Sequence, residues 1–145
     1  MLDGLGDEHL NLAPPAFGKT AGWLLGHLCI TADFARKLCG RRAICPAEWR
    51  ATFSPGTTPP EDAAAYPQMS ALCDAFRRTY QDLCDAALAA DDAMLSVPTP
   101  FERARPAFPT VREFLPWLMT GHLAYHLGQL GDWRRVAGLG HKGNI

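Results

Sequence analysis

Hydrophobic residues recur at helical spacing in three long segments of this sequence, and no segment shows the alternation typical of a β-strand. The chain has 145 residues, 48% of them hydrophobic, which is enough for one buried core. We therefore expect an all-α protein that folds as a single domain over residues 1–145. The three expected helices cover about residues 20–39, 67–90 and 110–137.

The connections and helix ends carry local signals of their own. Residues 40–60 contain the Pro, Gly and Thr of a long loop, in which AEWRATF could form a short helix. In the third expected helix, Thr110 and Glu113 match a capping box. Pro116 follows within that helix and lacks an N–H, so we expect a kink or a 3₁₀ turn there.

Two histidines interrupt the apolar stripe of the third expected helix, in the stretch TGHLAYHLGQL. His122 and His126 are four residues apart, so their side chains lie on one face and can converge on a single ion. His27 occupies an apolar stripe of a different expected helix. Burying three imidazoles without partners is costly, whereas a shared divalent ion would satisfy all three. This pattern favours a metal site over buried core histidines.

The metal site would have three histidine ligands, which suit Zn²⁺, Ni²⁺ or Fe²⁺. The sequence offers no evident fourth His or inward carboxylate, and an open coordination position favours chemistry. Leu123 follows His122 where the zincin motif requires a Glu, which argues against a protease. His9 and His141 lie near the ends in polar sequence, and we expect both to be solvated.

Several other residues have a local interpretation. Tyr125 and Gln129 could orient a ligand or a substrate from behind the site, or could be surface residues. Asp33 follows His27 by six residues, so we expect it to point away from the site, on the polar side of its helix. Glycines inside the third expected helix suggest a close helix approach or a cavity wall; they are Gly121, Gly128 and Gly131.

Charge and cysteine content exclude several classes of protein. The net charge of -1 does not indicate the basic surface that binds nucleic acid. No apolar run reaches the length of a membrane span. The N-terminal residues are acidic and do not resemble a signal peptide. Five cysteines without a C-x-x-C pair favour buried, reduced thiols. We therefore expect a cytoplasmic protein that contacts neither nucleic acid nor membrane.

The paired motifs GWLLGHL (residues 22–28) and GHLAYHLGQLGDWRRVAGL (residues 121–139) resemble the DinB/YfiT-like metal-binding proteins. The resemblance covers about residues 5–139 and implies an up-and-down four-helix bundle. It assigns the three metal ligands to His27, His122 and His126 and places Gln129 one turn beyond. This family usually has a full helix before the segment that matches residues 5–20. The first helix would here be short, missing or supplied by a partner, and the AEWRATF segment could instead help to cover the core. We expect a homodimer.

The resemblance also implies a range of functions. Some DinB/YfiT-like proteins are transferases or isomerases that use a low-molecular-weight thiol, and others are described as hydrolases. We expect a metal-dependent, thiol-dependent transferase or a hydrolase acting on a small molecule. The alternative is a non-catalytic protein that binds the metal for structure or stress response. No general acid or base can be named from the residues.

Overall fold

Helices make up all regular structure in residues 1–14 and 18–140, which are the residues that the computed structural model describes. The part described contains one isolated β-bridge, between Pro98 and Thr110. The all-α expectation is therefore confirmed. The long elements are α1 (Ala21–Leu38), α3 (Met69–Ala89) and a third, composite helix of α5 (Val111–Trp117), the π-helical turn η4 (Leu118–His122) and α6 (Leu123–Val136).

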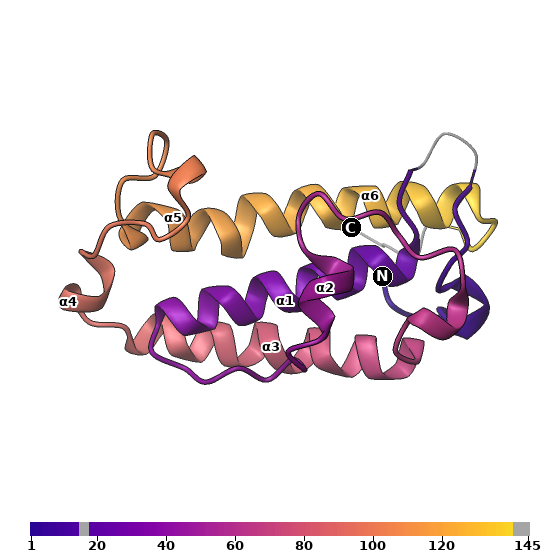
Figure 1. Ribbon diagram of the computed structural model, residues 1–145, viewed down its shortest axis with the longest axis horizontal. Coiled ribbons are helices and arrows are strands. Elements are labelled where there is room, and N and C mark those ends of the chain that lie inside the picture. Colours follow the sequence, from indigo (N-terminus) through magenta and orange to yellow (C-terminus); the bar gives the residue numbers. More distant parts are fainter. Residues whose placement is uncertain (15–17, 141–145) are drawn as a thin grey trace.

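The long helices form a layer in which α1 lies between α3 and α6 (Figure 1). α3 packs along most of α1, and α6 and η4 contact the opposite side of α1. As the central helix, α1 buries apolar side chains on several sides, and Leu24, Leu25 and Leu28 are fully buried. Among the described residues, no helix is both long enough and apolar enough to span a membrane.

Short elements fill the connections between the long helices. The expected short helix in the 40–60 loop is present as α2 (Trp49–Phe53), which packs against α1 (Figure 1). The second expected helix, about residues 67–90, is α3, and Pro67 lies just before its N-cap Gln68. The remaining short elements are η1 (Asp7–His9), η2 (Ala63–Ala65), α4 (Asp92–Leu95) and η3 (Glu102–Ala104).

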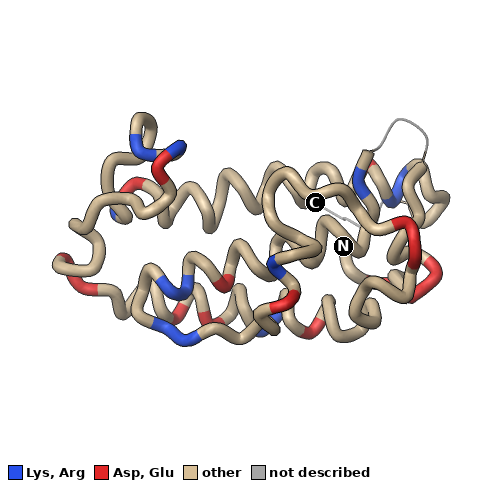
Figure 2. The backbone as a smooth tube through the Cα atoms, viewed as in Figure 1, with Lys and Arg blue, Asp and Glu red and all other residues tan. Residues whose placement is uncertain are grey.

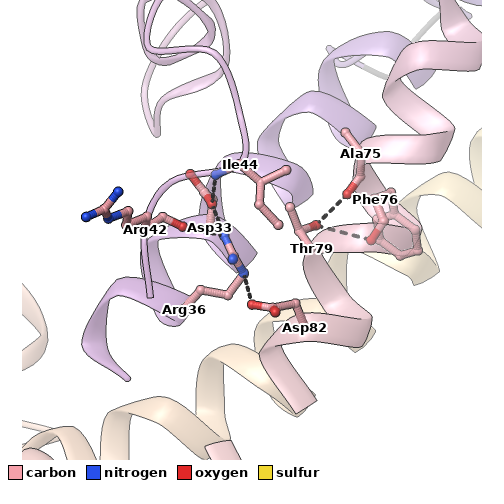
Figure 3. A network of polar contacts seen from close by, with 8 residues as sticks. All are labelled: Asp33, Arg36, Arg42, Ile44, Ala75, Phe76, Thr79 and Asp82. Atoms are coloured by element: carbon pink, nitrogen blue, oxygen red, sulfur yellow. Dashed lines mark hydrogen bonds and ion pairs between the residues drawn. The ribbon is translucent and has the colours of Figure 1, made fainter. Parts of the chain in front are cut away.

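Asp33 lies on the polar side of α1 as expected, but this side is buried around Asp33 and Arg36. Both are at most 4% exposed, because the segment after α1 folds back over them and α3 packs beside them (Figure 3). The Arg36 guanidinium donates to carboxylates of Asp33 and Asp82, each at 2.6 Å. It also donates to the carbonyl of Arg42, while the Ile44 N–H donates to Asp33. Arg36 thus joins α1, α3 and this loop.

The third helix changes its winding just before the histidines. The Glu113 carboxylate accepts hydrogen bonds from the Thr110 N–H at 2.9 Å and the Thr110 hydroxyl at 2.6 Å, so it anchors the helix start. After Pro116 the structure has the π-helical turn η4 (Leu118–His122) and no 3₁₀ turn. The Thr120 hydroxyl donates to the Pro116 carbonyl at 2.7 Å. A π-helical turn often marks a functional site.

The N-terminal residues pack against the end of α6. The Trp133 indole N–H donates to the Leu12 carbonyl at 2.9 Å, and the His9 ring lies edge-on to Trp133 at a centroid distance of 5.7 Å. The His9 side chain is only 12% exposed, so the expectation that it is solvated was wrong. His141 lies outside the described residues. All five cysteines are free; four are buried as expected, but Cys84 is exposed.

Candidate metal centre

Three histidines from two helices converge in the middle of the layer. His27 comes from the middle of α1, His122 is the last residue of η4, and His126 lies one turn later in α6. One ring nitrogen from each histidine lies within 4.8 Å of the corresponding nitrogens of the other two. The Nε2 atoms of His27 and His122 are 3.2 Å apart. The structure therefore brings together all three of the expected ligand residues.

α2 fixes the orientation of His27. The carbonyl of Phe53 can only accept a hydrogen bond, so the His27 Nδ1–H donates to it at 2.8 Å. This bond selects the tautomer whose Nε2 lone pair faces the other histidines. The Phe53 ring covers Gly26, where an added Cβ would come within 2.5 Å of the ring. On another side the Trp23 ring stacks on His27 at 4.8 Å and an interplanar angle of 6°.

A hydrogen-bonded chain behind His126 fixes that ring in the same way. Gln129 donates from Nε2 to the Tyr125 hydroxyl at 3.2 Å, which directs its carbonyl oxygen to His126. The His126 Nδ1–H then donates to this oxygen at 2.7 Å, leaving its Nε2 lone pair free. Gln129 and Tyr125 thus occupy the positions expected of residues that orient a ligand, although the Tyr125 side chain is largely exposed.

His122 completes the cluster, and the ring nitrogens of the three histidines decide whether a cation fits between them. Its Nδ1 is buried and has no hydrogen-bond partner within the described residues, and its Nε2 faces that of His27. The Nε2 lone pairs of His27 and His126 are held in place by their Nδ1–H bonds and point into one small space. Converging neutral imidazole nitrogens are the donor set that borderline divalent ions prefer. The residues therefore fit a divalent ion.

Burial keeps the three rings neutral. Desolvation lowers the pKa of His27 to about 4 and that of His122 to about 3, and neighbouring histidines add to both shifts. Burial also lowers the pKa of His126, partly offset by its bond to Gln129. At neutral pH all three are therefore unprotonated, which is the form that binds a metal.

Comparison with known proteins agrees with this arrangement. A family model described as the DinB superfamily matches residues 1–130. The chain belongs to the DinB superfamily. No curated protein and no solved structure matches it. The resemblance read from the two histidine motifs is thus confirmed at the level of the family, and the helical bundle is the one expected for a DinB-like protein.

The pH dependence of stability follows from these pKa directions in the metal-free DinB protein. An unfolded histidine titrates near pH 6.5, whereas His27 and His122 resist protonation until far lower pH. The unfolded state therefore binds protons first, and stability falls as the pH is lowered from 7.5 to 5. We expect a loss of at least about 2 kcal/mol, measured by urea unfolding. A triple variant with alanine at all three positions should lose clearly less; an equal loss would contradict the assignment.

One aromatic ring beside the histidines, that of Trp117, was not singled out from the sequence. Trp117 lies edge-on to His122 at 5.4 Å and is 39% exposed. Gly121 packs under that ring, where an added Cβ would come within 3.1 Å of Trp117. An added Cβ at Gly128 would meet nothing within 4 Å beyond its chain neighbours and its own helix backbone, so of the two expectations, a close helix approach or a cavity wall, the close approach is wrong there. Trp117 precedes His122 by five residues, a spacing that brings the two side chains together only in the π-helical turn, so the α-helical pattern gave no signal for this contact.

Two further residues at the centre were missed. Phe53, which orients His27, belongs to the segment read as a short helix, but its contact with α1 spans 26 residues of sequence. Lys19 precedes α1, and its ammonium lies 3.7 Å from the centroid of the Trp23 ring. Its position one residue before the helix cap Thr20 was visible in the sequence, yet nothing there indicated which way the side chain turns.

Proposed function

We propose that this DinB-superfamily protein binds one divalent ion, Zn²⁺, Ni²⁺ or Fe²⁺, through His27, His122 and His126 and is an enzyme. The proposed activity is thiol-dependent transfer, with a low-molecular-weight thiol as co-substrate, or hydrolysis of a small molecule. The observation that carries it is the convergence of three neutral ring nitrogens, two of them held in a metal-binding tautomer.

The number of ligands supports chemistry over a structural role. Within residues 1–14 and 18–140, no Cys, Asp, Glu or further His joins the three histidines. Structural zinc sites usually have four protein ligands, whereas catalytic sites keep a position for an outside ligand. A bound divalent ion would act as a Lewis acid there and lower the pKa of a coordinated water or thiol.

The chain itself supplies orientation and a partly apolar surround. Phe53 orients the His27 ring, and Gln129 orients the His126 ring. Trp23 stacks on the face of His27, and Trp117 lies edge-on to His122. The free cysteines fit a reducing compartment, where small thiols are available, so we place the protein in the cytoplasm. The alternative is a non-catalytic metal-binding protein, against which the count of only three protein ligands argues.

Cobalt substitution tests the proposed thiol chemistry. We expect Co²⁺-loaded protein titrated with small thiols to develop a thiolate charge-transfer band in the near ultraviolet. His126→Ala should give no such band while keeping its helical circular dichroism, because the apolar faces of the long helices supply most of the stability. His9→Asn removes an imidazole outside the cluster and should behave as wild type. A loaded wild-type protein whose spectrum ignores every thiol would favour hydrolysis or the non-catalytic alternative.

We further propose a homodimer. A four-helix core needs one more long helix than the three long helical segments of the described chain provide. Phe76 and Tyr80 on α3, and Leu123 and Leu127 on α6, are only partly buried and could pack against a second copy. Light scattering at micromolar concentration should give twice the chain mass of 15.8 kDa. A mass equal to one chain would contradict this prediction.

A further inference from the structure

The two helices that carry the three histidines have almost no charged side chains in the turns around these histidines. No Lys, Arg, Asp or Glu occurs in residues 20–32 of α1 and its cap, or in residues 114–131 of the third helix (Figure 2). The proposed ligands are themselves neutral. These helices would therefore not compensate the two positive charges of a bound ion, and an anionic ligand would be favoured electrostatically.

Lys19 adds a third positive charge beside this region. Its ammonium donates to the Thr57 carbonyl at 2.8 Å and lies over the Trp23 ring, whose plane is parallel to that of His27. It makes no ion pair within the described part of the chain. Its ammonium lies 3.7 Å from the centroid of the Trp23 ring, and that ring lies 4.8 Å from the centroid of His27.

The surroundings of Lys19 hold its charge in place without neutralising it. A carbonyl oxygen and an aromatic face each attract an ammonium but leave its net charge intact. These two contacts also restrict the long side chain before any ligand arrives. Binding a ligand then costs less conformational entropy. The third donor position of the ammonium is then available to an anion.

We infer that the small molecule acted on or used by this protein carries an anionic group that pairs with Lys19 while another of its atoms reaches the histidine cluster. This inference rests on the proposed function and narrows its substrate or co-substrate to an anion. A carboxylate at one end and a thiol at the other is the simplest chemistry that satisfies both positions.

Paired thiols can test the inference on Co²⁺-loaded protein. The probes are ω-mercaptocarboxylates with two to five methylene groups, each matched with the ω-mercaptoalcohol of the same length. The thiolate band gives a dissociation constant for every probe. We expect the best carboxylate to bind more tightly than its alcohol in wild type, and this preference to fall on the order of fivefold in Lys19→Met. Comparing ratios between proteins cancels the differences in thiol pKa.

Two further variants make the result specific. Lys19→Arg keeps the charge and should keep most of the preference for the carboxylates. Lys37→Met removes an exposed lysine from the last turn of α1, far from the histidines, and should change nothing. An unchanged preference in Lys19→Met, with the band intact, would overturn the inference and leave the proposed function standing. A fully loaded protein that shows no thiolate band with either series would overturn the inference together with the thiol-dependent form of the proposed function.

Discussion

Replacing Arg36 with methionine should destabilise the protein by about 3–5 kcal/mol, the largest loss that we expect from a single substitution. Arg36 is 4% exposed and bridges the carboxylates of Asp33 and Asp82 (Figure 3). Without the guanidinium, Asp33, which is 3% exposed, keeps a buried negative charge and only the N–H of Ile44 as a donor. The segment that folds back over α1 loses its bond to Arg36 as well.

An exposed ion pair on α3 provides the control for Arg36. Arg77 contacts Asp74 at 3.1 Å, and both side chains are more than half exposed. Arg77→Met should cost no more than about 1 kcal/mol, because water screens such a pair. Urea unfolding at pH 7.5 measures both variants. Equal losses for Arg36→Met and Arg77→Met would contradict the view that the buried network joins α1, α3 and the loop.

Gly26→Ala should lower both stability and metal affinity. The new Cβ would lie within 2.5 Å of the Phe53 ring near its attachment point, so α2 itself must move. Overpacking of this kind costs about 1–3 kcal/mol. Moving α2 also displaces the Phe53 carbonyl that accepts from His27, and loss of such a supporting bond typically weakens metal binding about 10–100-fold.

Gly128→Ala is the matched control for Gly26→Ala. Gly128 lies inside α6, and an added Cβ there would meet nothing within 4 Å beyond its chain neighbours and its own helix backbone. The same chemical change should therefore stabilise the helix by roughly 0.5–1 kcal/mol. Thermal unfolding and a competitive metal titration of both variants check the pair. A Gly26→Ala protein that binds metal like wild type would contradict the proposed role of Phe53.

Helical periodicity and the two histidine motifs predicted the features that depend on spacing along one helix. The long helices and the facing of His122 and His126 are of this kind, because each involves residues within one or two turns. The bond from His126 to Gln129 is equally local, and it matches one of the two interpretations given for Gln129. The meeting of His27 with the other two depends on how α1 and α6 pack. It followed from the family resemblance and the cost of burying imidazoles, not from spacing.

The features missed depend on segments that fold back from far along the chain. An amphipathic pattern places Asp33 and Arg36 on a polar face, and nothing in it reveals that the following loop covers that face. The contact of Phe53 with Gly26 is equally non-local. At Pro116 a change in helix winding was expected, but the missing N–H alone does not choose between a 3₁₀ and a π-helical turn.

Metal content tests the central claim most directly. The wild-type protein and a variant with His27→Ala, His122→Ala and His126→Ala should be expressed without a histidine tag, purified side by side and subjected to elemental analysis. We predict up to one equivalent of Zn, Ni or Fe per wild-type chain and a background level in the triple variant, with similar helical content by circular dichroism. Equal metal content in the two proteins would show that the three histidines do not form the metal site.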